Sequence, residues 1–489
     1  MAMIRFDHVT FAYPGSYDNV FEDCSFQFDT SWKLGLIGRN GRGKTTLLRL
    51  LQHQCPYTGT ITGTALFDYF PYPIEDKSRM TTDILNEICP TAQEWELLRE
   101  FSYLELEPEV LWRPFCTLSN GEQTKALLAA FFLNEGHFPL IDEPTNHLDL
   151  HARQVVASYL HQKKGYILVS HDRAFLDDCV DHILSINKTT IDVQAGNFSS
   201  WWENFSRQQQ FEEKQNERLQ HDITRLRKSV ARTSNWSDQI EASKYGDGSA
   251  DKGYIGHQSA KMMKRAKAIA QRRERAIEQT AALLKNTEKA EALKIHPLTH
   301  HKKTLVTVSD VSVSYDENTV CEPVSFAVEQ GERVCLTGKN GSGKSSLLKL
   351  ILGQNIPHAG TVSCASGLII SYLPQDPSFL RGTLAEWILE TGVDETLFKT
   401  ILRKLDFERV QFEKPMQGYS QGQKKKVLIA TSLCEKAHLY LWDEPLNYID
   451  VYSRMQIEAL LQTANPTMIF VEHDRAFAEQ IATKMQMLS

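Results

Sequence analysis

The segment GRNGRGKT, from Gly38 to Thr45, recurs as GKNGSGKS, from Gly338 to Ser345. Both copies fit the pattern GxxxxGK[ST], whose glycines allow backbone N–H groups to turn toward phosphate oxygens. A short apolar run precedes each copy, and the helix-favouring runs TTLLRLLQ and SSLLKLIL follow. A glycine-rich loop between a buried strand and a helix N-terminus binds phosphate. The sequence therefore predicts two nucleotide-binding loops in an α/β chain.

Three more motifs recur around these loops in the same order. LSNGEQ (118–123) is repeated as YSQGQK (419–424), LIDEPTNHLD (140–149) as LWDEPLNYID (441–450), and VSHDRAF (169–175) as VEHDRAF (471–477). The spacing from lysine to signature serine is 75 residues in one copy and 76 in the other. The chain is thus predicted to hold two copies of one α/β domain with a largely parallel sheet, at 1–198 and 304–489.

Each loop supplies a set of groups for binding ATP and Mg²⁺. The lysine is expected to reach the β- and γ-phosphates, and the following hydroxyl to hold Mg²⁺. The residues expected at the nucleotide are Gly38, Asn40, Gly41, Gly43, Lys44, Thr45 and Thr46 in the first copy, and Gly338, Asn340, Gly341, Gly343, Lys344, Ser345 and Ser346 in the second.

Acidic and histidine side chains follow the apolar strands in both copies. Asp142 and Asp443 are candidates for the metal, and the adjacent Glu143 and Glu444 for polarising the attacking water. A neutral His171 or His473 at a strand end can contact the γ-phosphate. Taken singly, such carboxylates and histidines are more often structural. Their recurrence at equal offsets favours catalytic roles.

The motifs together resemble those of ATP-binding cassette (ABC) ATPases, over roughly 390 residues. In that family two cassettes close head to tail and sandwich two ATP molecules. The resemblance implies that the Lys44 loop faces a signature made by Ser420, Gly422 and Gln423, and that the Lys344 loop faces Ser119, Gly121 and Glu122. It also implies that Tyr13 and Tyr315 stack on adenine and that Gln375 contacts Mg²⁺. The first copy has Tyr72 in place of the glutamine, so the two sites are expected to be unequal.

Between the cassettes, residues 199–303 hold no cassette motif. Two proline-free helical stretches, 201–229 and 257–293, flank a segment with four glycines, which predicts a helical hairpin with a loop tip at about 232–256. From Arg207 to Lys303 there are 21 Lys and Arg against 12 Asp and Glu, while the whole chain has a net charge of −7. A basic segment between acidic domains predicts contact with a polyanion.

The residues predicted to contact RNA are aromatic and basic side chains of this linker. Bases stack on aromatic rings, and lysine and arginine neutralise phosphates. The candidates are Trp236, Lys244, Tyr245, Lys252, Tyr254, Lys261, Lys264, Arg265 and Lys267. Two alternatives stay open: the basic run as a solvated helix face, and the aromatics as anchors of their own loop.

Twin cassettes with such a linker resemble the ABC-F family, and KGYIGHQSAKMMKRAK (252–267) is similar to the antibiotic-resistance branch of the Lsa/Vga type. The resemblance implies an ATPase that protects the 70S ribosome: it enters the E site, contacts 23S rRNA and P-site tRNA, and dislodges lincosamides, streptogramin A and pleuromutilins. A housekeeping translation factor and the ATPase subunit of an efflux pump remain alternatives.

Composition limits the remaining possibilities. The N-terminus MAMIRFDHVTF has no signal peptide, and the most apolar window, ALLAAFFL, has eight residues, whereas a bilayer requires about 20. The nine cysteines form no CxxC pair, which is typical of a reducing compartment. The chain is therefore expected to be cytoplasmic, without a membrane partner, and monomeric away from the ribosome.

Overall fold

The computed structural model describes residues 3–14, 19–134, 136–146, 148–187, 190–242, 264, 268, 271–272, 293–315 and 318–488. Contacts divide the chain into one compact unit made of Met1–Trp201 with Ala290–Ser489, and a second unit, Trp202–Lys289. The first unit contains both nucleotide-binding domains, here called the first and second cassette. The second unit contains most of the segment between them.

The first cassette is built on a six-stranded sheet of order β5-β6-β7-β3-β8-β9. Its strands are β3 (Lys33–Gly38), β5 (Leu66–Phe70), β6 (His137–Asp142), β7 (Tyr166–Val169), β8 (His182–Ile186) and β9 (Ile191–Ala195). All neighbours are parallel except β8 and β9. Because β3, β6 and β7 are parallel, their carboxyl ends meet at one edge of the sheet, where the candidate site residues follow.

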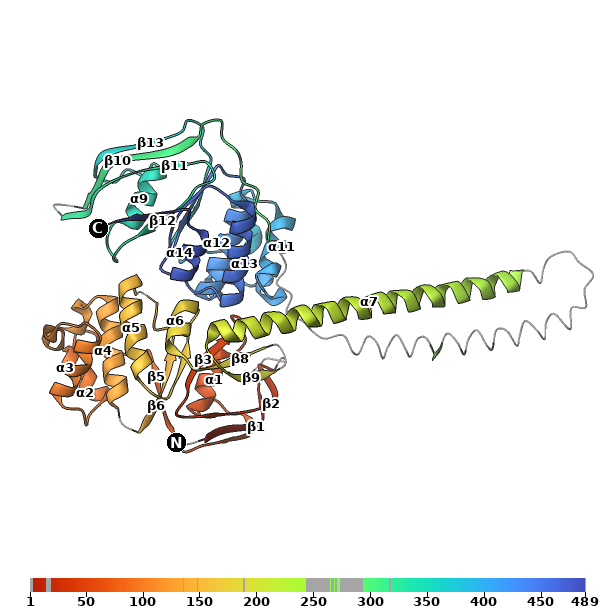
Figure 1. Ribbon diagram of the computed structural model, residues 1–489, viewed down its shortest axis with the longest axis horizontal. Helices are drawn as coiled ribbons and strands as arrows, with labels where there is room; N and C mark the ends of the chain where they lie inside the picture. The colour runs from red at the N-terminus through yellow and green to blue at the C-terminus, as the bar shows by residue number, and fades with distance from the viewer. Residues whose placement is uncertain are drawn as a thin grey trace, which may run out of the picture. The chain divides into compact units, whose positions relative to one another are not determined.

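Helices cover this sheet, and a smaller antiparallel sheet packs beside it (Figure 1). The helices are α1 (Lys44–Leu51), α2 (Thr81–Ile88), α3 (Glu94–Tyr103), α4 (Asn120–Leu133), α5 (Leu150–Gln162) and α6 (Arg173–Cys179). The smaller sheet has the order β2-β1-β4, from β1 (Met3–Phe11), β2 (Phe21–Asp29) and β4 (Thr58–Thr62). The core between the two sheets holds Phe6, Phe28, Leu34 and Leu140.

The second cassette repeats this plan. Its parallel sheet has the order β14-β15-β16-β12-β17, from β12 (Arg333–Thr337), β14 (Ile370–Leu373), β15 (Leu439–Asp443), β16 (Met468–Val471) and β17 (Lys484–Met487). The antiparallel sheet contains β10 (Thr304–Tyr315), β11 (Asn318–Glu329) and β13 (His358–Cys364). The helices are α9 (Lys344–Ile351), α10 (Leu384–Thr391), α11 (Glu395–Lys404), α12 (Gln421–Cys434), α13 (Val451–Ala464) and α14 (Arg475–Ile481).

Helix α7 runs without a break from Phe198 to Ala242. The predicted loop tip at 232–256 was therefore wrong at its start, because residues 232–242 are helical. The sequence gives the reason: the glycines of that segment all lie after Ala242, the first being Gly246, and no proline precedes them. Trp236 consequently lies on the helix backbone and not in a loop.

The end of the expected linker also differs from the structure. Leu293 and Ile295 are buried in the core of the second cassette, and the Leu298 N–H donates to the carbonyl of Ala437 at 2.8 Å. Residues 293–303 thus pack with the second cassette, although they were expected to belong to the linker.

No helix in the described part of the chain is long and apolar enough to cross a membrane.

Candidate nucleotide-binding sites

The two phosphate-binding loops have the same backbone geometry. Gly41 and Gly341 both have φ of 84°, and Gly43 and Gly343 have φ of 93° and 79°, in the left-handed region that glycine adopts without strain. The Lys44 ammonium lies across its own loop and donates to the carbonyl of Gly38 at 2.7 Å. Lys344 donates in the same way to Gly338 at 2.9 Å and to Lys339 at 2.7 Å. Main-chain carbonyls thus hold both ammonium groups at their loops.

The helices that follow these loops start without a side-chain cap. The N-cap residues of α1 and α9 are glycines, which have no side chain to accept a backbone N–H of the first turn. Helices α4, α5, α6, α12, α13 and α14, in contrast, all begin with a serine or aspartate that accepts a backbone N–H. Uncapped N–H groups at a helix start bind an anion. The uncapped N–H groups of α1 and α9 are thus suited to bind phosphate.

The aspartates that end β6 and β15 suit a magnesium ion that also contacts phosphate. The Thr45 hydroxyl donates to Asp142 Oδ2 at 3.1 Å, and Ser345 hydrogen-bonds Asp443. Burial raises the pKa of both aspartates, and within the described residues Asp443 Oδ1 is buried without a hydrogen-bond donor. The described residues form no cluster of three or more metal-ligating side chains. A hydroxyl, one carboxylate and phosphate oxygens are ligands that Mg²⁺ accepts, so these residues fit Mg²⁺–ATP.

The catalytic candidates lie beside these groups. Glu143 Oε1 is 3.4 Å from His171 Nε2, and Glu444 Oε1 is 3.7 Å from His473 Nε2. Burial, followed by the neighbouring charge of Asp142, raises the pKa of Glu143 to about 8. Burial acts on Glu444 in the same direction, but the neighbouring His473 and a hydrogen bond from Gln375 outweigh it and lower its pKa. The two sites therefore differ in the electrostatics of their candidate bases.

Gln375 and Tyr72, which occupy equivalent positions in the repeat, have different surroundings. Gln375 hydrogen-bonds Glu444 and lies in the second site. Tyr72 turns to Glu87 and packs its ring on Phe131, with a centroid distance of 6.4 Å. In the first site, Tyr69 contacts Asp142, the candidate metal ligand. The Tyr69 hydroxyl donates to Asp142 Oδ2 at 2.9 Å.

Sequence reasoning missed Tyr69. Tyr69 is on the strand next to β6 and is paired with Leu140, two residues before Asp142, and the local sequence does not show this pairing of strands. The predicted adenine-stacking residue Tyr13 lies near the first loop, since its hydroxyl is 2.8 Å from Thr46 Oγ1. The side chain of its counterpart Tyr315 lies outside the described residues.

The signature residues start two helices with reciprocal caps. The Ser119 hydroxyl accepts the Glu122 N–H at 3.2 Å, and Glu122 accepts the Ser119 N–H at 2.8 Å. Ser420 and Gln423 form the same pair, at 3.3 and 3.0 Å. These capping boxes fix the direction of both helix starts.

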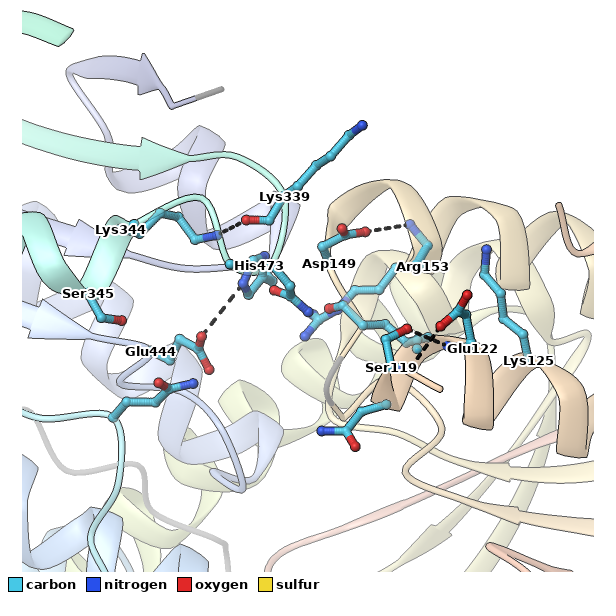
Figure 2. Close-up of a pocket in the computed structure, with 18 of the residues that line it drawn as sticks. Ser119, Glu122, Lys125, Asp149, Arg153, Lys339, Lys344, Ser345, Glu444 and His473 are labelled. Carbon is cyan, nitrogen blue, oxygen red and sulfur yellow. Dashed lines mark hydrogen bonds and ion pairs between the residues drawn. The ribbon is translucent and has the colours of Figure 1, made fainter. Parts of the chain in front are cut away.

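The second site is a cavity of about 760 Å³ whose walls come from both cassettes. Lys344, Ser345, Glu444 and His473 project from one side and Ser119 and Glu122 from the other (Figure 2). Its lining includes Gly121, Asn340, Gly341, Gly343, Ser346 and Gln375. The structure thus places these predicted residues around one cavity, with the signature from the opposite cassette.

The first site is formed by contacts between its loop and the second cassette. Asn40 Nδ2 donates to the carbonyl of Tyr448 at 2.8 Å. A Cβ atom on Gly422 would lie 2.5 Å from that carbonyl and 2.9 Å from Asn40 Nδ2, so only glycine fits. Burial lowers the pKa of Lys44, opposed first by the charge of Asp450 in the second cassette. The predicted head-to-tail pairing of loop and signature is therefore present at both sites.

Most of the predicted RNA contacts cannot be placed. The side chain of Trp236 lies outside the described residues, as do Lys244, Tyr245, Lys252, Tyr254, Lys261, Arg265 and Lys267. Lys264 is described as a helical, exposed residue.

Comparison with known proteins finds one family twice along the chain. The ABC transporter family model matches residues 21–146 and 321–447. Ribosome protection protein VmlR of Bacillus subtilis (strain 168) is 29% identical over 98% of this chain and 85% of its own. The energy-dependent translational throttle protein EttA of Haemophilus influenzae is 25% identical over 95% and 88%. The archaeal ribosome recycling factor aABCE1, solved with the stalk protein aP1, aligns with a TM-score of 0.65 at 19% identity, covering 98% of this chain and 87% of that one.

Proposed function

The chain belongs to the ABC transporter family, as an ABC-F ATPase with two cassettes, and from this premise we propose that it protects ribosomes from antibiotics. In this proposal the ATP-bound protein enters the E site of the 70S ribosome. Its linker contacts 23S rRNA and displaces the P-site tRNA. Lincosamides, streptogramin A or pleuromutilins then leave the peptidyl transferase centre.

Helix α7 is the observation that carries the proposal. Its 45 residues correspond to a length of about 68 Å at the usual rise per residue. The segment from Arg207 to Lys303 has nine more basic than acidic residues, whereas the chain as a whole is acidic. A long helix followed in the chain by a basic segment suits an RNA cavity, because phosphate contacts supply most of the affinity for nucleic acid. VmlR, a ribosome protection protein, matches nearly the whole chain and supports the same assignment.

In this proposal, ATP binding and hydrolysis at the two nucleotide sites control binding to the ribosome and release from it. Bound Mg²⁺–ATP would supply the γ-phosphoryl group for hydrolysis. Lys44 and Lys344 would bind the phosphates, and the pairs Thr45 with Asp142 and Ser345 with Asp443 would hold the metal. Glu143 and Glu444 orient the attacking water and accept its proton, with His171 and His473 beside them. Each cassette contributes its signature residues to the opposite site, so each site closes only when the two cassettes are together.

Drug susceptibility of a sensitive host tests the proposal. Wild-type protein is expected to raise the inhibitory concentration of at least one of the three drug classes. Replacing both candidate bases, Glu143→Gln with Glu444→Gln, is expected to remove this protection, because both sites can still close but cannot activate water. Resistance to none of the three classes would contradict the ribosome-protection function.

The same double variant has a second expected property, which concerns ribosome binding. With ATP added, it should remain on 70S particles that carry initiator tRNA, since hydrolysis no longer releases it. Co-sedimentation measures this retention, with membranes as the comparison fraction. Release as fast as that of the wild-type protein would show that these glutamates are wrongly assigned, and binding to membranes alone would favour an efflux partner.

A housekeeping role in translation is the second candidate, and the match to the translational throttle protein EttA favours it. In that case the double Gln variant still binds ribosomes, but the wild-type protein confers no drug resistance. Susceptibility and co-sedimentation measured together therefore separate the two functions.

A further inference from the structure

Lys425 is a fully buried cation on α12, with none of its surface exposed. Its ammonium donates to three backbone carbonyls: Pro374 at 2.9 Å, Gln375 at 2.9 Å and Asp443 at 3.3 Å. A buried ammonium without partners is strongly unfavourable, so these three acceptors are what allows Lys425 to lie there. The lysine in turn joins three segments: α12, the turn after β14, and the end of β15.

The carbonyls that Lys425 binds belong to catalytic segments of the second site. Gln375 hydrogen-bonds Glu444, the candidate base, and Asp443 is the candidate metal ligand. Holding the main chain of Gln375 against that of Asp443 fixes the distance between the glutamine amide and the glutamate. Lys425 itself binds only main-chain atoms here and is not expected to touch the nucleotide.

The first cassette provides an internal comparison. The motifs SNGEQTK and SQGQKKK place Thr124 at the position equivalent to Lys425. The Thr124 hydroxyl donates to the carbonyl of Asn120, one turn earlier on its own helix, at 2.9 Å. Among the described residues, it makes no hydrogen bond to the turn after β5, where Tyr72 faces Glu87. The lysine anchor and the glutamine therefore occur together in one cassette and are both replaced in the other.

We propose that Lys425 is a positioning residue of the second site, which holds Gln375 in place for hydrolysis there and has no equivalent in the first site. Removing the ammonium leaves three carbonyls without their donor and frees the turn after β14. Gln375 then moves relative to Glu444. Since small displacements of this kind chiefly affect the chemical step, the rate of hydrolysis should fall more than the affinity for ATP. This inference concerns ATP hydrolysis alone and does not depend on ribosome protection.

Single-turnover ATP hydrolysis by the full-length protein tests the proposal. Glu143→Gln leaves only the second site active, and Glu444→Gln only the first. In the Glu143→Gln background, Lys425→Met is expected to reduce the rate constant by about tenfold to a hundredfold, with a smaller change in ATP affinity. Lys425→Arg, which keeps donors at this position, should recover part of the loss. Lys424→Met makes the same change at a neighbouring, partly exposed residue and should have little effect.

The Glu444→Gln background distinguishes positioning from general damage. The first site uses Ser420 and Gly422, which lie at the start of the same helix as Lys425. If Lys425→Met merely disrupted α12, the rate of the first site would fall equally, and the proposal would be wrong. An unchanged first site with a slowed second site supports it.

A double-mutant cycle then identifies the residue through which Lys425 acts. If it acts through Gln375, Lys425→Met combined with Gln375→Ala should be no slower than the slower single variant. Fully additive losses would overturn the assignment, because they would show that the two residues contribute independently.

Discussion

Individual side chains make the two nucleotide sites chemically different, although the loops around them share one backbone geometry. In the first site Asp142 accepts hydrogen bonds from Thr45 and Tyr69, and Glu143 has a pKa raised by burial. In the second site Gln375 hydrogen-bonds Glu444, whose pKa is lowered. In the first site the Tyr69 phenol thus stabilises the candidate metal ligand Asp142. In the second site the Gln375 amide stabilises the candidate base Glu444.

We expect Tyr69→Phe to weaken the response of the first site to Mg²⁺. The phenol stabilises the ionised carboxylate of Asp142 and orients it, and partners of this kind contribute about tenfold or more to metal affinity. In the Glu444→Gln background, the Mg²⁺ concentration for half-maximal ATPase should therefore rise by about tenfold.

Tyr372→Phe in the Glu143→Gln background is the matched control, since Tyr372 occupies the equivalent position on β14. Its Mg²⁺ response should be nearly unchanged. A lower Mg²⁺ requirement after Tyr69→Phe would have the opposite meaning, namely that the hydroxyl competes with the metal for the carboxylate.

Residues that belong to repeated motifs could be identified from the sequence, because the repeat itself supplied the comparison. Lys44, Asp142 and Glu143 each had a counterpart at nearly the same offset. Tyr69 and Lys425 could not be identified in this way. Their roles depend on which strand lies beside β6 and on what the buried end of α12 faces, and neither is a property of local sequence.

At the scale of elements, capping and glycine content explain why the structure follows the sequence in some places and departs from it in others. Ser119 and Ser420 each begin a helix with a reciprocal cap, as expected of serine followed by glutamate or glutamine. The strands before the loops were equally predictable from their apolar runs. The end of α7 could not be predicted in this way. The run after Ser229 is polar, as loops are, but it contains no residue that breaks a helix until Gly246.

The continuity of α7 leads to a prediction. Gln220→Pro places a proline at an exposed position inside the helix, which removes a backbone donor and costs about 3 kcal/mol or more of helix stability. Gln220 belongs to neither cassette, so basal ATPase activity should be largely retained while drug protection is lost. Inhibitory concentrations and ATPase rates of the same preparation measure this separation.

Gln220→Ala is the control for the loss of the glutamine side chain, and it should protect as well as the wild-type protein does. Equal loss of ATPase and protection in the proline variant would mean that α7 is required for the cassettes themselves. Full protection by the proline variant would show that a continuous helix is unnecessary.

At the scale of the whole molecule, the two cassettes meet unevenly across their two sites. Asp406 of the second cassette lies 3.7 Å from Arg39 and 3.6 Å from Arg42 in the first loop, and the Arg39 guanidinium lies 5.2 Å from the ring centre of Tyr452. Repeat symmetry relates these four residues to Glu105, Lys339, Ser342 and His151. There Glu105 contacts His151 of its own cassette at 2.7 Å, and Lys339 is exposed.

These contacts predict that the first site is held closed by protein groups, whereas the second depends on ATP. Asp406→Asn removes the charge that pairs with both arginines. Without nucleotide, residues 39–46 should then exchange amide hydrogens about fivefold faster or more, which corresponds to a loss of about 1 kcal/mol. Hydrogen–deuterium exchange of the loop peptides in the full-length protein measures this change. Glu105→Gln, the equivalent substitution, should leave residues 339–346 unchanged, because Glu105 pairs within its own cassette. Equal exchange in the two loops of the wild-type protein, or no response to Asp406→Asn, would show that the closed first site does not rest on this ion pair.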